Sequence, residues 1–62
     1  MPSGVKNKIY DYLLQNKGKE FTAEEVASAV GIEKVAVVKA QLTRLIREGK
    51  VEKTADGRYR AK

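Results

Sequence analysis

The stretch "FTAEEVASAVGIEKVAVVKAQLTRL", residues 21–45, contains the pattern that decides the fold. Thr22 followed by Glu25 is typical of a capping box, in which each side chain satisfies a free amide of the first helical turn. Apolar residues then recur at helical spacing until Gly31, where a glycine can end a helix in the left-handed conformation. A further helix is predicted from residue 33 or 34 to residue 48. The stretch therefore predicts two consecutive helices joined at a glycine.

The second of these helices is expected to have two different sides. On a helical wheel its larger apolar residues cluster together and predict the face that packs on the core: Val35, Val38, Leu42, Leu45 and Ile46. The opposite side carries smaller or basic residues, with Val37 at its edge: Ala36, Ala40, Thr43, Arg44 and Arg47. Lys39 and Gln41 lie at the two boundaries between these faces.

The segments before this stretch predict one more helix and a short strand. Apolar spacing predicts a helix over residues 4–16, with Ser3 as its N-cap and Gly18 just after its end. Residues 19–22 are expected to add one short edge strand, with Phe21 anchored to the core.

After Gly49 the spacing changes from helical to alternating, which predicts a C-terminal hairpin. Asp56 and Gly57 tolerate positive φ and predict a tight turn between its strands. Tyr59 is expected to be a core residue of the sheet, and Lys53 to share the inward side of its strand with Val51.

Composition bounds the function classes. The length of 62 residues predicts one domain over residues 1–62, with a flexible start at residues 1–3. The net charge of +5 is typical both of proteins with a polyanionic partner and of small domains whose charge serves solubility alone. It contains no cysteine or histidine, so disulfides, thiolate metal sites and the commonest general base are excluded. No apolar run approaches the ~20 residues that span a membrane, and we expect an intracellular protein of the cytoplasm, nucleoid or nucleus.

The predicted order is helix, short strand, helix, helix and hairpin, an α+β fold. This order resembles the winged helix-turn-helix family over nearly the whole chain. The residues that carry the resemblance are Ala27 and Gly31 with their apolar neighbours, and the passage "LTRLIREGKVEK" at residues 42–53. The final "TADGRYRAK", residues 54–62, is faintly similar to the wing of linker-histone globular domains. The chain departs from the family at Ala36, Val37 and Ala40, where hydrogen-bonding side chains are common.

The resemblance implies a double-stranded DNA-binding domain, such as a small transcriptional regulator or another DNA-associated protein. In that family the last helix lies in the major groove and the wing contacts the backbone or the minor groove. The residues implied to bind nucleic acid are Lys34, Lys39, Gln41, Thr43, Arg44, Arg47, Lys53, Arg58 and Arg60. Arg44 or Gln41 could contact bases, and the remaining cations suit phosphates.

Other interpretations stay open. Arg47 can be a solvated cation at a helix end, and Arg44 can pair with Glu48 one turn later. The alternative function is a protein-interaction module that uses the Ala36/Val37/Ala40 face. We expect no enzyme activity, cofactor or metal, because the acidic pair Glu24 and Glu25 is explained by the first turn of a helix.

Overall fold

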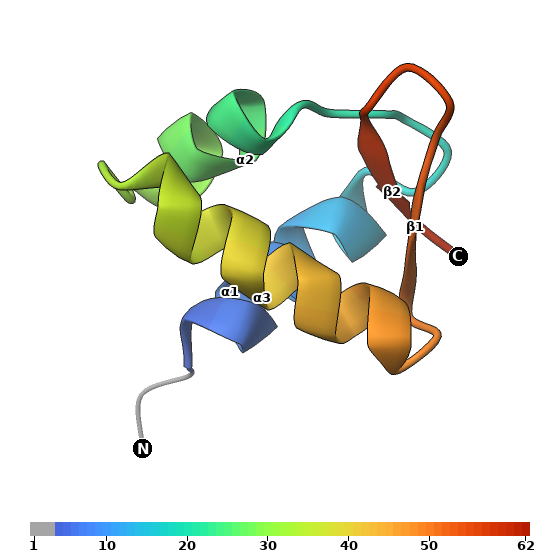
Figure 1. Cartoon of the computed structure of the whole chain (residues 1–62), viewed down its shortest axis with the longest axis horizontal. Helices are drawn as coiled ribbons and strands as arrows, with labels where there is room; N and C mark the ends of the chain where they lie inside the picture. The colour runs from blue at the N-terminus through green and yellow to red at the C-terminus, as the bar shows by residue number, and fades with distance from the viewer. Residues whose placement is uncertain (1–3) are drawn as a thin grey trace.

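The computed structural model describes residues 4–62, over which three helices precede a two-stranded antiparallel hairpin (Figure 1). The elements are α1 (Val5–Gln15), α2 (Ala23–Val30), α3 (Val35–Arg47), β1 (Val51–Lys53) and β2 (Tyr59–Ala61). This α+β arrangement is compatible with a winged-helix topology. The expectations for Ser3 and for a flexible start fall on residues 1–3, outside the described residues; Gly4 is the N-cap of α1 and makes no side-chain cap.

The core lies where the three helices and the hairpin meet. The predicted inner sides of the helices face the core, where most of their larger apolar residues are fully buried and Val35 and Ile46 of α3 are partly buried. Each fully buried side chain contributes about 1.5–3 kcal/mol to folding through its removal from water. The largest fully buried residues are Ile9, Leu13, Val26, Val38, Leu42, Leu45 and Val51.

Both ends of α2 form as the sequence predicts. The Glu25 amide donates to Thr22 Oγ1 at 3.1 Å, and the Thr22 amide donates to Glu25 Oε1 at 2.8 Å, which completes the capping box. Gly31 has φ 76°, and the Ile32 amide donates back to the Ala27 carbonyl at 2.8 Å. These bonds end the helix and turn the chain into α3.

The predicted strand at residues 19–22 is wrong. In the described part of the chain no strand lies between α1 and α2; Phe21 instead makes a single bridge to Tyr59, with N···O distances of 2.9 and 2.7 Å. The ladder stops there because the next residue, Thr22, already serves as the N-cap of α2. Phe21 does anchor this segment, and its ring centroid lies 5.1 Å from that of Tyr12.

The hairpin forms, but with a longer connection than the predicted tight turn. Val51 pairs with Ala61 and Lys53 pairs with Tyr59, which leaves residues 54–58 between the strands. The Gly57 amide donates to the Thr54 carbonyl at 3.0 Å, and Gly57 has φ 83°. Among the described residues only glycines have positive φ, so Asp56 does not adopt the conformation of a two-residue turn. A β-turn followed by a left-handed glycine explains the extra length.

Candidate nucleic-acid interface

The third helix presents four cations to solvent. Lys34 is its N-cap, and Lys39, Arg44 and Arg47 lie on its exposed positions. Within residues 4–62 none of these four forms an ion pair. One reason is that α3, VAVVKAQLTRLIR, contains no acidic residue, and another is that Glu48, one turn after Arg44 at the C-cap, pairs with Lys6 and Lys50 instead. Their charge is therefore not offset by a carboxylate contact.

The outer side of α3 divides along the helix axis. Its first half carries Ala36, Val37 and Ala40, all exposed, with Val37 38% exposed. Its second half carries Arg44 and Arg47, also exposed. The helix thus offers a small apolar surface beside a cationic one. We call the three residues of the first half the apolar strip.

Two polar residues of the predicted interface are less available than the cations. The Thr43 hydroxyl donates to the Lys39 carbonyl of its own helix at 2.9 Å, so its proton is already used. Gln41 is half-buried at the boundary between the inner and outer sides of α3. Neither arrangement favours base contacts in the geometry that the structure shows.

The interpretation that Arg44 pairs with Glu48 is wrong. Glu48, the C-cap residue of α3, contacts the Lys6 ammonium of α1 at 2.6 Å and Lys50 at 3.6 Å. The hydrogen bond from Lys6 holds the pKa of the Glu48 carboxyl below its ordinary value; the charges of both lysines also lower it and outweigh its partial desolvation. Glu48 therefore links the end of α3 to α1, and Arg44 has no ion-pair partner within residues 4–62.

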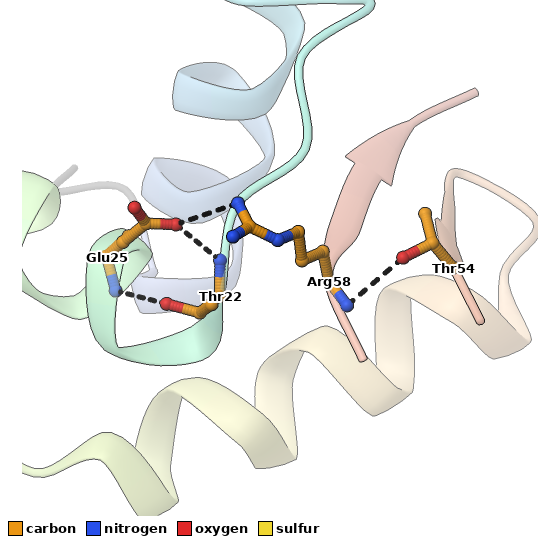
Figure 2. Close-up of polar contacts among 4 residues, drawn as sticks. All are labelled: Thr22, Glu25, Thr54 and Arg58. Atoms are coloured by element: carbon orange, nitrogen blue, oxygen red, sulfur yellow. Dashed lines mark hydrogen bonds and ion pairs between the residues drawn. The ribbon is translucent and has the colours of Figure 1, made fainter. Parts of the chain in front are cut away.

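In the hairpin, Arg58 lies against the first turn of α2. Figure 2 shows its guanidinium reaching the carboxylate of the capping box, with Arg58 Nη1 3.8 Å from Glu25 Oε1. The same carboxylate oxygen accepts from the Thr22 amide. The Arg58 amide donates to Thr54 Oγ1 at 3.2 Å, which fixes the backbone beside the loop (Figure 2). One carboxylate thus caps a helix and holds an arginine of the hairpin.

Arg60 is paired as well. Its Nε lies 3.2 Å from Glu52 on the neighbouring strand, and its Nη1 lies 3.6 Å from Glu20 in the segment before α2. Both predicted wing arginines are only partly exposed, with 43% of the Arg58 side chain and 41% of the Arg60 side chain accessible. Each would have to leave a carboxylate in order to contact an external phosphate.

Lys53 and Tyr59 are cross-strand partners with different surroundings. Tyr59 is 7% exposed, which confirms that it belongs to the core. Lys53 lies two residues after Val51 and directly opposite Tyr59, so it shares their side of the hairpin as predicted, but it is exposed near the end of the short strand. Its ammonium lies 5.8 Å from the centre of the Tyr59 ring, a cation–π distance, and remains open to solvent.

The sequence interpretation missed the acidic partners of the hairpin. Glu52 lies directly opposite Arg60, a pairing that follows from the strand register and could have been found once the register was assumed. Glu20 and Glu25 come from a distant part of the sequence and meet the hairpin only because Phe21 bridges to Tyr59. No local sequence pattern predicts those two contacts.

The turn between α2 and α3 is acidic. A shallow depression there is lined by Glu24 and Glu33 together with Ala27, Ser28, Gly31, Ile32 and Val35. The first turn of α2 is also occupied by its own carboxylate, since Glu25 caps it. An anion therefore meets a more favourable field along α3 than at the start of α2.

Over residues 4–62 no group of three or more acidic, cysteine or histidine side chains is placed to hold a metal ion. No helix in the same range is long and apolar enough to cross a bilayer.

Comparison of the chain with protein-family models, curated proteins and solved structures finds no significant match.

Proposed function

We propose that this chain is a winged-helix domain that binds double-stranded DNA, mainly by holding phosphates along α3. The observation that carries the proposal is the set of exposed cations on that helix without carboxylate partners in residues 4–62: Lys34, Lys39, Arg44 and Arg47. A small transcriptional regulator and another DNA-associated protein are both consistent with this role.

The physical basis is the release of counterions from the duplex. Each phosphate neutralised by Lys or Arg contributes about −0.9 to the slope of log K against log salt. Four contacts from α3 would give a slope of about −3.6. Such binding needs no particular sequence, and α3 has few side chains that can form hydrogen bonds with bases. The domain is therefore better suited to holding a duplex than to selecting a sequence.

The test is fluorescence anisotropy of a labelled random-sequence duplex, titrated with the protein at several salt concentrations. We expect log-linear weakening with a slope of about −2 to −4, because two to four phosphates are neutralised. Absence of binding at low salt would refute the proposal.

A matched pair of variants places the contact on α3. Arg44→Gln with Arg47→Gln is expected to reduce the size of the slope by about 1.8, equivalent to two phosphate contacts. Lys17→Gln with Lys19→Gln removes the same charge from exposed residues of the loop after α1 and should leave most of the slope. Equal losses from the two double variants would indicate that net charge alone attracts the duplex.

A second function, binding of a protein partner, is favoured by one observation. Val37 is 38% exposed between two exposed alanines, and such a surface can accept an apolar helix. We rank this function second because the strip is small and has unpaired cations beside it. A protein bound through the strip should tolerate Arg44→Gln with Arg47→Gln, whereas a duplex should not.

A further inference from the structure

The apolar strip of α3 is unlike the other exposed parts of that helix. Val37 is one of the larger apolar residues left exposed, and Ala36 and Ala40 lie beside it with no side-chain atoms beyond Cβ. Small side chains let a helix backbone approach another surface closely. Cations of the same helix, Lys39 and Arg44, border the strip, and no acidic residue lies within α3.

Charge complementarity narrows the choice of what can cover this strip. A surface that docks here must accept unpaired cations at its margins, which a duplex does through its phosphates. Inside the major groove the only apolar group on a natural base-pair edge is the 5-methyl of thymine. An apolar strip between phosphate-binding cations matches a row of such methyl groups better than it matches the polar edges of bases.

Hydrogen-bonding competitors are few at this position. The Thr43 hydroxyl donates to its own helix, and Gln41 is half-buried on the flank. Contact at the strip is therefore decided by shape and apolar burial. Such a dependence on apolar burial can be measured, because burying one methyl-sized group changes the binding affinity by about four-fold.

We infer that the Ala36/Val37/Ala40 strip senses pyrimidine 5-methyl groups in the major groove, so that the domain prefers thymine-containing duplex DNA. The inference rests on the proposed function and adds a chemical preference to it. The cations of α3 supply binding to any duplex, and the strip adds a contribution that depends on the methyl group alone.

The experiment compares two short duplexes of one mixed sequence, one with thymine and one with uracil at every such position. The two carry the same charge and base-pairing groups and differ in the 5-methyl. Anisotropy titrations at one low salt concentration are expected to give about four-fold tighter binding to the thymine duplex for each methyl buried. A third duplex, with 5-methylcytosine in place of cytosine, should not bind more weakly than its unmethylated form.

Variants then assign the preference to the strip. Val37→Ser with Ala40→Ser should bring the thymine-to-uracil affinity ratio close to one while the uracil duplex still binds. The matched control is Leu14→Ser with Ala29→Ser, which changes one exposed larger apolar residue and one exposed alanine on α1 and α2. This control should retain the wild-type ratio. Circular dichroism verifies that both variants fold, and the comparison of duplexes with the wild-type protein needs no variant.

The outcomes separate this inference from the proposed function. Salt-dependent binding with a thymine-to-uracil ratio of one, or a preference for uracil, overturns the inference and leaves phosphate-based binding intact. A ratio that the strip variant leaves unchanged also overturns it. Failure to bind any duplex at low salt overturns both the inference and the proposed function, and it leaves the binding of a protein partner as the function of the strip.

Discussion

The outer side of α3 and the C-terminal hairpin are both basic, yet their cations have different surroundings. On α3, Arg44 and Arg47 extend from a helix without acidic residues and form no ion pair in residues 4–62. In the hairpin, Arg58 and Arg60 each lie beside a carboxylate from another segment. Equal formal charge thus hides a difference in how readily each group can meet a phosphate.

This difference teaches that counts of basic residues are a poor guide to binding sites in a small domain. An exposed ion pair contributes little to stability, about 0–1 kcal/mol, but its partner must be displaced before an external anion can take its place. Arg58 has an additional constraint, because its partner Glu25 is also the capping carboxylate of α2. The arginines of the hairpin are therefore engaged in contacts within the fold, and they are less available to an external anion than the cations of α3.

The largest expected effect comes from neutralising the two arginine pairs separately. At about 0.1 M salt, Arg44→Gln with Arg47→Gln should weaken duplex binding about 60-fold, because two phosphate contacts contribute about 1.8 to log K there. Arg58→Gln with Arg60→Gln removes the same charge and should weaken it less than about 5-fold. Anisotropy at that salt concentration measures both. Equal losses of affinity would show that phosphates readily displace the carboxylates that pair with Arg58 and Arg60.

Glutamine is the appropriate replacement in the hairpin. A glutamate at position 60 would stand beside Glu20 and Glu52, and one at position 58 beside Glu25. Charge reversal would therefore disturb folding as well as binding, and the two effects would be mixed.

The second prediction concerns the helix start on which the hairpin rests. Thr22→Ala removes the hydroxyl that accepts from the Glu25 amide, and should destabilise the domain by about 1 kcal/mol, or about 4–8 °C in Tm. Thermal unfolding followed by circular dichroism measures the change. Thr22→Ser keeps the acceptor and should recover most of the loss, and Ser28→Ala, at an exposed position within α2, should change Tm little. A Tm for Thr22→Ala equal to that of Ser28→Ala would contradict the role of the cap.

A smaller effect should distinguish Glu25 from its neighbour Glu24. Glu25→Gln retains the capping box, which accepts glutamine, but removes the charge that holds Arg58. At about 0.1 M salt duplex affinity is expected to rise by at most about eight-fold, the contribution of one added phosphate contact. Glu24→Gln makes the same change of charge one residue away, at a side chain that has no ion pair in residues 4–62. If both variants bind equally well, the effect is one of net charge and Arg58 is not restrained.

The smallest expected effect lies at the junction between α3 and the hairpin. Because the folded-state pKa of Glu48 is lowered from its ordinary 4.5, its contribution to stability is present above that pH and is lost as pH falls through the folded-state pKa. Melting curves from pH 7 downward should show a small Tm difference between wild type and Glu48→Gln that disappears in acid. A difference that persists at the lowest pH would exclude ionisation of Glu48 as its origin.

Much of the fold could be predicted because its signals are local. The capping box at Thr22, the glycine stop at Gly31 and the apolar spacing of α3 each lie within a few residues of one another, and each is found in the structure. The exposed cations of α3 were predictable for the same reason, since helical periodicity alone assigns Arg44 and Arg47 to the side opposite Leu42.

The two failures have different physical causes. Whether residues 19–22 form a strand depends on how far β2 runs alongside them, and the cap at Thr22 limits that contact to Phe21. The hairpin loop depends on a hydroxyl of Thr54, which favours a longer connection than the Asp56–Gly57 pair suggests.

The sequence by itself determined the helices, the inner and outer sides of α3, and the presence of a basic hairpin, because periodicity, capping and charge act over a few residues. Only the tertiary structure decided which cations remain free. Arg58 pairs with Glu25, and Glu48 pairs with Lys6 and not with Arg44. The partners in both ion pairs are far apart in the sequence, so no local pattern predicts them. Electrostatic availability depends on the neighbours that folding supplies, and those neighbours are set by the packing of the whole chain.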